Sequence, residues 1–159
     1  MFHYALQYVM HAAMDDVDRK IIELLAEDSR RSLADIGGAV GLSPSAVNER
    51  IRRLTGSGAI RRFTVDADPE AMGLEVLAFV WVALAPGADE GAFRDFARAH
   101  PAIAECHHVT GPWSYLVKVH VASLAGIEGF LGELKAGGFL ARSETVIALS
   151  SPALGGFAP

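Results

Sequence analysis

Residues 43–63 bring together side chains that could bind a nucleic acid. This stretch holds five arginines and one acid, Glu49, so its formal charge is +4, whereas the whole chain carries −5. Arginines bind phosphates, and short polar side chains with an arginine can read base edges in the major groove of DNA. We therefore expect double-stranded DNA as a partner. The residues expected to contact it are Ser43, Ser45, Asn48, Glu49, Arg50, Arg52, Arg53, Arg61 and Arg62.

Helical geometry divides these side chains between the faces of residues 44–55. At about 100° per residue, Val47, Ile51 and Leu54 fall together and are expected to face a core. The opposite face is polar and is expected to meet the bases; it carries Ser45, Asn48, Glu49 and Arg52. The cations expected to meet phosphates lie on the flanks or follow the helix; they are Arg50, Arg53, Arg61 and Arg62.

Three short helices are predicted to position this polar face. Asp15 precedes an apolar stripe at helical spacing, which is typical of a first helix. Ser32 is suited to cap a second helix that Gly41 closes, and Ser43 is suited to cap the third. A tight, glycine-containing turn between two short helices favours a helix-turn-helix over an ordinary solvated helix face. We predict such a domain, of winged-helix-like type, over residues 14–64.

The second half of the chain alternates strand and helix patterns. The predicted order is a strand at 74–84, a helix ending near 99, strands at 102–109 and 113–121, a helix near 127–134, and a strand at 142–150. This βαββαβ order is that of a ferredoxin-like domain, so the fold class is α+β.

Residues 74–84 also predict self-association. The βαββαβ order places both helices on one face of the sheet, yet this strand has no polar side to show to water. A second copy of the chain is the simplest cover, so we expect a homo-oligomer. The expected segments are an N-terminal extension (1–13), the helix-turn-helix domain (14–64), a linker (65–73), an oligomerisation and effector domain (74–150) and a C-terminal tail (151–159).

The remaining composition excludes several classes of protein. The single cysteine, Cys106, excludes an internal disulfide framework and a Cys-rich zinc module, and is expected to be a small buried hydrophobe. No apolar run reaches the roughly 18 residues of a membrane span, and the first residues lack the basic region of a signal peptide. We therefore expect a cytoplasmic protein with no membrane partner, no metal site, no cofactor and no catalytic residue.

Four segments carry a family resemblance. They are DDVDRKIIELL at 15–25, LSPSAVNERIRRL at 42–54, GAIRRFT at 58–64 and HVTGPWSYLVKV at 108–119. Together they resemble the Lrp/AsnC family, the feast/famine regulators, over about residues 14–150. The resemblance implies a transcriptional regulator with an N-terminal DNA-binding domain and a C-terminal domain that dimerises and often binds an amino-acid effector. Dimers of that family commonly assemble further, often into octamers.

The turn before the third strand departs from the family's pattern. Where the family has a sequence like Gly-Asp-Tyr-Asp-Tyr, this chain has Gly-Pro-Trp-Ser-Tyr at 111–115, so both aspartates are replaced. Without a carboxylate there, the ammonium group of an effector must rely on carbonyl oxygens or water. We expect weak binding of an apolar or aromatic amino acid, or none. The effector residues that the resemblance implies are Thr110, Gly111, Trp113, Ser114 and Tyr115.

The alternative hypothesis is an enzyme. Some chains that resemble this family act on tetrapyrroles, and His107, His108 or His120 would then contact haem or substrate. Adjacent residues on a strand point to opposite faces, so His107 and His108 cannot easily share one metal ion. The polar face of residues 44–55 favours the regulator, because an enzyme would have no use for it.

Overall fold

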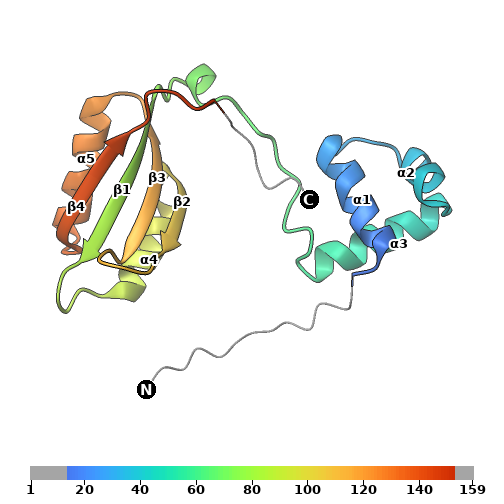
Figure 1. The fold of residues 1–159 in the computed structure, drawn as a ribbon, viewed down its shortest axis with the longest axis horizontal. Coiled ribbons are helices and arrows are strands. Elements are labelled where there is room, and N and C mark those ends of the chain that lie inside the picture. Colours follow the sequence, from blue (N-terminus) through green and yellow to red (C-terminus); the bar gives the residue numbers. More distant parts are fainter. Residues whose placement is uncertain (1–13, 153–159) are drawn as a thin grey trace. The chain divides into compact units, whose positions relative to one another are not determined.

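The computed structural model describes residues 14–152, which form two compact units that divide between Val65 and Asp66 (Figure 1). The expected extension 1–13 and residues 153–159 of the expected tail lie outside the described part. The expected linker begins at the division, and three of its residues form a short 3-10 helix, η1 (Glu70–Met72). Each unit has its own hydrophobic core.

The N-terminal unit consists of α1 (Asp16–Glu27), α2 (Leu33–Val40) and α3 (Pro44–Gly56). Each helix starts at a side-chain cap, in which Asp15, Ser32 or Ser43 accepts a hydrogen bond from the backbone N–H three residues later. Gly41 closes α2 with φ 71°, a left-handed conformation that glycine adopts without strain. These local signals confirm the predicted helix-turn-helix.

The turn between α2 and α3 depends on a close backbone approach at Gly37. The Leu42 N–H donates to the Gly37 carbonyl oxygen at 2.9 Å. A Cβ atom at position 37 would collide with the carbonyl oxygen of Leu42, so no larger residue fits without a shift of the turn. The turn lies beside a small core; its buried side chains are Ile21, Leu24, Ile36, Val47 and Leu54.

Of the expected winged-helix-like domain, the described residues contain the three helices but no wing. Between α3 and β1, residues 57–75 contain η1 and no strand. A wing is a β-hairpin and needs two strands that pair. Here Phe63 and Val65 alternate as a strand would, but no described segment pairs with theirs, and they are 53% and 85% exposed.

The C-terminal unit is an antiparallel sheet with two helices on one face (Figure 1). Its elements are β1 (Val76–Leu84), α4 (Glu90–Ala99), β2 (Ile103–His108), β3 (Tyr115–Val121), α5 (Leu124–Ala136) and β4 (Leu140–Ile147). The strand order is β2-β3-β1-β4, which confirms the predicted βαββαβ arrangement. β3 begins two residues later than expected, so Trp113 and Ser114 belong to the turn.

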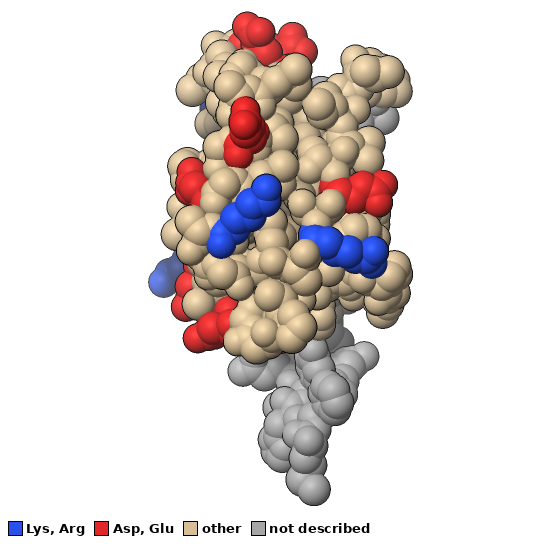
Figure 2. Space-filling view, turned by 90° about the vertical axis from the view of Figure 1, so that its left-hand side faces the viewer, with Lys and Arg blue, Asp and Glu red and all other residues tan. Residues whose placement is uncertain are grey.

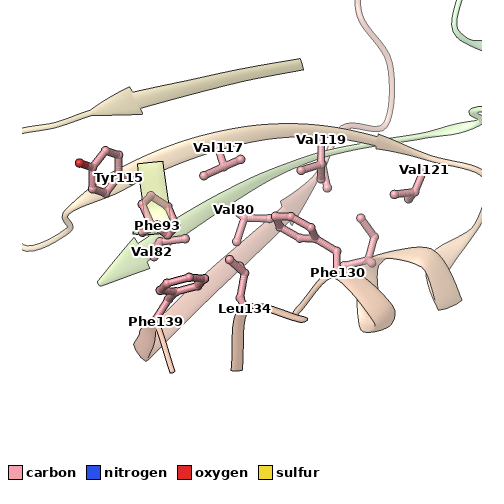
Figure 3. Close-up of a cluster of buried hydrophobic side chains, with 12 residues drawn as sticks. Val80, Val82, Phe93, Tyr115, Val117, Val119, Val121, Phe130, Leu134 and Phe139 are labelled. Atoms are coloured by element: carbon pink, nitrogen blue, oxygen red, sulfur yellow. The ribbon is translucent and has the colours of Figure 1, made fainter. Parts of the chain in front are cut away.

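One face of this sheet packs on the helices. Alternate residues of the central strands point to that side, and their side chains interdigitate with aromatic and aliphatic side chains from the helices and Phe139 (Figure 3). The buried residues shown are Val80, Val82, Phe93, Tyr115, Val117, Val119, Val121, Phe130, Leu134 and Phe139. Strand alternation therefore directs the intervening residues to the other side.

The other side, which we call the open face, carries Leu77, Phe79, Trp81 and Ala83 of β1. These side chains are only partly buried, and no helix of the C-terminal unit covers them. The strand is thus apolar on both sides, as its sequence predicts.

Candidate DNA-reading helix and effector turn

Helix α3 presents the predicted division of faces. Val47 and Leu54 are buried in the core of the N-terminal unit, and Ile51 is half-buried against it. On the solvent side, the Arg52 side chain is 75% exposed and only 3.9 Å from the carboxylate of Glu49. The exposed polar side chains of this face are Ser45, Asn48, Glu49 and Arg52. This face can approach a groove of DNA without rearrangement of the core.

Ser43 caps the N-terminus of α3. Its hydroxyl oxygen accepts the Ala46 N–H at 3.3 Å and lies 3.0 Å from the Ser45 hydroxyl. The first turn of the helix is therefore fixed from within, and the Ser45 hydroxyl is held beside it.

Arg50 and Arg53 both form ion pairs with α1, although the Arg53 side chain remains 51% exposed. Arg50 Nη1 lies 2.7 Å from both an Asp15 and an Asp18 carboxylate oxygen, and Arg53 Nη2 lies 2.6 Å from Asp18. Asp18 is only 2% exposed. Because two arginines donate to this buried carboxylate, its charge is compensated. We call this group, Asp15, Asp18, Arg50 and Arg53, the α1–α3 clamp.

The clamp changes the electrostatics of the predicted DNA face. The hydrogen bond from Arg50 holds the pKa of Asp15 below its ordinary value, and Asp15 and Asp18 in turn raise the pKa of Arg50. Asp18 is not among the partners that the sequence predicts for Arg50 and Arg53. Its spacing from Ile21 and Leu25 places a carboxylate on the apolar stripe of α1, and this unusual position is the signal that indicates a buried ion pair. Among the arginines predicted to contact DNA, Arg52, Arg61 and Arg62 are exposed and lie outside the clamp. Arg53 is exposed as well, although it is paired with Asp18.

The C-terminal unit offers no comparable concentration of positive charge on the face drawn in Figure 2. That face, on the side of α5 and β4, is mostly uncharged, with scattered acidic and basic side chains. A groove of about 530 Å³ lies between α5 and β4, and both aliphatic side chains, such as Leu131 and Ile147, and charged ones, Glu128 and Lys135, line it. It is separate from the predicted effector turn.

The turn at 109–114 is fixed to the neighbouring strand through Ser114. The Ser114 N–H donates to the Val82 carbonyl at 2.8 Å, and the Ser114 hydroxyl accepts the Leu84 N–H at 3.1 Å. Gly111 has φ 100°, a conformation that requires glycine. Ser114 therefore holds the turn in place, while Thr110 and Gly111 lie exposed at its tip.

Tyr115 points to the helix side of the sheet, away from the open face. Arg94 Nε donates to the Tyr115 hydroxyl at 2.7 Å, and that hydroxyl donates to Glu90 at 2.7 Å. Burial raises the pKa of Tyr115, while the bonds from Tyr115 and Arg94 lower the pKa of Glu90. In this structure Tyr115 joins α4 to the sheet, and it does not line the same surface as Trp113.

Trp113 belongs to an aromatic group at the end of the open face. Its ring lies 6.3 Å from that of Trp81, centroid to centroid, and the Arg142 guanidinium sits 4.3 Å above it. Arg142 also donates to the Pro112 carbonyl at 3.2 Å. Trp81 and Arg142 are absent from the predicted effector residues because only the folded sheet brings them to the turn.

The histidines of the enzyme hypothesis do not form one group. His107 lies 3.1 Å from Glu105 on the open face, whereas His108 stacks on Tyr115 on the helix side. Burial lowers the pKa of His120, which lies opposite Leu77. Among residues 14–152, no cluster of three or more His, Cys, Asp or Glu side chains could hold a metal ion. Within the same range, no helix has the length and apolar character to cross a bilayer.

Two family models match the chain, one in each unit. The AsnC-type helix-turn-helix domain matches residues 14–55, and the Lrp/AsnC ligand binding domain matches residues 77–155. These two matches cover most of both units.

Curated relatives are named as transcriptional regulators. The HTH-type transcriptional regulator FL11 of Pyrococcus horikoshii is 35% identical over 122 residues, which is 77% of this chain and 80% of the relative. The HTH-type transcriptional regulator LrpA of Mycobacterium tuberculosis is 32% identical over 139 residues, 87% of this chain and 92% of the relative. These names favour a regulator over a tetrapyrrole-acting enzyme.

Solved structures share the fold. Bacillus subtilis LrpC is 30% identical with a TM-score of 0.78, covering 87% of this chain and 96% of that one. The feast or famine regulatory protein of M. tuberculosis, complexed with L-methionine, is 30% identical with a TM-score of 0.81, covering 89% of this chain and 96% of that one.

Proposed function

The chain belongs to the Lrp/AsnC family of DNA-binding transcriptional regulators, and we propose that α3 reads its operator while the C-terminal sheet joins chains and binds an amino-acid effector. The observation that carries the DNA part is the exposed polar face of α3 opposite a buried apolar face. A cytoplasmic location fits this role, since chromosomal DNA is the partner.

Base contacts are proposed for Asn48 and Arg52, whose side chains are exposed on this face. Arg61 and Arg62 follow α3 and contact phosphates. Arg50 and Arg53 belong first to the α1–α3 clamp, so their role in DNA binding is indirect: they fix the orientation of α3. Ser43, Ser45 and Glu49 complete the surface.

Selection from fragmented genomic DNA with the full chain tests this proposal. At moderate salt, we expect an enriched sequence motif. Arg52→Ala should weaken binding to that motif by about 1–3 kcal/mol and relax the preference at one base position, because an arginine contact to a base edge is lost. If no motif is enriched, the proposed reading by α3 is wrong.

Two chains are proposed to associate through the open face, with further assembly up to an octamer. Partly exposed Leu77 and Phe79 supply the apolar surface that this association would bury. Light scattering on the full chain at micromolar concentration should give at least twice the chain mass of 16.9 kDa. A stable single-chain species would contradict the proposal.

The effector is proposed to be an amino acid with an apolar side chain, bound beside Thr110, Gly111 and Trp113. Trp113 supplies an apolar ring, while Ser114 and Tyr115 hold the turn in position. A ligand in excess over its Kd raises the thermal stability of the folded state, so a melting screen of the twenty amino acids is the test. No shift with any of them would overturn this part of the proposal.

A further inference from the structure

We propose that the groove between α5 and β4 is a second association surface, in which α5 of another copy of the chain lies antiparallel to α5. This inference rests on the proposed self-association and deepens it, because it names the contact that links the pairs formed through the open face. The groove is on the helix side of the sheet and the open face is on the other side, so one chain can use both surfaces at once.

The groove exposes apolar surface. Its volume is about 530 Å³, and two of its lining side chains, Leu124 and Ile147, are 63% and 42% exposed. Ile147 lies opposite Ala78, which is buried beneath the helices, so the β4 wall of the groove is on the helix side of the sheet. Figure 2 shows that this side of the unit carries few charges. A partner that covers the groove would remove this apolar surface from water.

Two charged side chains of α5 also line the groove. Among the ion pairs of the described residues, none includes Glu128 or Lys135. The two residues are seven positions apart, about 10.5 Å along the helix axis, so they do not pair with each other. A surface that fits this groove therefore carries a cation and an anion at the same spacing and in the reverse order.

An antiparallel copy of α5 has this charge pattern. If the two-fold axis passes between residues 131 and 132, Glu128 of each chain lies opposite Lys135 of the other. Contacts across a two-fold axis have this property, since residue i meets residue j and residue j meets residue i. Exposed ion pairs add little affinity, but they select the antiparallel orientation, because a parallel pair would place like charges together.

The glycines of α5 fit the same contact. Gly126 is explained within the chain, because a Cβ there would meet the Val121 side chain at 2.9 Å. Gly132 lines the groove, and a Cβ there would have no heavy atom within 4 Å, so packing within the chain does not require glycine. Glycine weakens a helix interior but allows a second helix to come close. In the antiparallel pair, Leu131 of the other chain lies opposite Gly132 and fills this space.

Two different two-fold contacts on one chain generate closed assemblies. The open face joins two chains, and the α5 contact links each of them to a chain of another pair. A ring that closes in this way holds an even number of chains, at least four, and four pairs give an octamer.

Charge reversal on the full chain tests the contact. Light scattering at micromolar concentration should give the wild type at least four times the chain mass of 16.9 kDa. Lys135→Glu places two acids opposite each other, and Glu128→Lys places two cations opposite each other, so each should lower the molar mass at least twofold. The double variant Glu128→Lys/Lys135→Glu brings opposite charges together again and should restore the wild-type mass. A double variant that stayed as small as the single variants would contradict this pairing.

A glycine replacement tests the close approach of the helices. Gly132→Leu has open space within its own chain and favours a helix, so it should fold and still lower the molar mass at least twofold. The matched controls are Arg98→Glu on α4, which reverses an exposed charge that does not line the groove, and Gly38→Leu on α2, where a Cβ also has open space. Both controls should keep the wild-type mass, and melting curves check that every variant folds.

The outcomes separate this inference from the proposed contact through the open face. If the wild type has the mass of two or more chains and the α5 variants all keep that mass, the groove takes another partner or none; the inference is overturned and the open-face contact stands. If the α5 variants are single chains, the α5 contact is supported and the open-face contact fails. If the wild type is itself a single chain, both fail.

Discussion

Replacing Arg50 or Arg62 with alanine should separate the folding role of one arginine from the DNA-binding role of the other. Arg50 donates to Asp15 and to the buried Asp18, whereas Arg62 is exposed in the segment after α3. Arg50→Ala should lower the melting temperature because the α1–α3 clamp loses hydrogen bonds to a buried carboxylate. It should leave the salt dependence of DNA binding unchanged, because we propose that Arg50 orients α3 and does not contact a phosphate.

Arg62→Ala should do the reverse. Each phosphate contact contributes about 0.9 to the slope of log affinity against log salt. Losing one contact therefore makes the fall in affinity between about 50 and 200 mM salt smaller by roughly 3.5-fold. The measurement is fluorescence anisotropy of a labelled duplex over this salt range, with melting curves for both variants. If Arg50→Ala reduced the slope by one unit and left the melting temperature unchanged, the clamp would be the wrong account of Arg50.

Three further predictions concern assembly, the turn and pH. Phe79→Asp puts a charge on the open face and should abolish the wild-type assembly, so an unchanged molar mass by light scattering would contradict the interface. Gly37→Ala should destabilise the fold by about 1–3 kcal/mol in a denaturant titration, because its Cβ meets the Leu42 carbonyl oxygen, whereas Gly38→Ala, where a Cβ has open space, should cost nothing. The pKa of Asp15 is lowered by Arg50, so its stabilising effect is complete above the ordinary value of 3.8 and is lost as pH falls through the lowered pKa. Melting between about pH 5 and pH 2 should therefore show a smaller pH dependence in Asp15→Asn, which keeps the helix cap; equal pH dependence would refute it.

Local signals in the sequence predicted most of the fold. Helix caps act within three or four residues, so a short segment of sequence is enough to predict them. This holds for the caps at Asp15, Ser32 and Ser43 and for the glycine at 41. The alternation from Tyr115 to Val121 is equally local, and it appears in β3 as a strict alternation of buried and half-buried residues.

Contacts between distant segments could not be predicted in this way. Arg50 and Asp18 are 32 residues apart, and an arginine on a helix flank looks the same whether it binds a phosphate or a carboxylate. The motif at 111–115 groups Tyr115 with Trp113, but the strand starts at Tyr115 and turns its side chain toward α4. Arg142 comes next to Trp113 only because β4 pairs with β1.

The two outer strands of the sheet have a consequence for how copies of the chain can join. An outer strand can recruit another chain's strand and so extend the sheet without limit, which leads to aggregation. In this protein β2 carries Glu105 and two histidines, and β4 carries Arg142 and Glu144. The ladders of both strands also shift register, between Ile103 and Glu105 for β2 and opposite Ala83 and Leu84 for β4. Charges and irregular pairing make both outer strands poor templates, so growth by strand addition is disfavoured. The proposed association through the open face would instead give a closed, finite assembly.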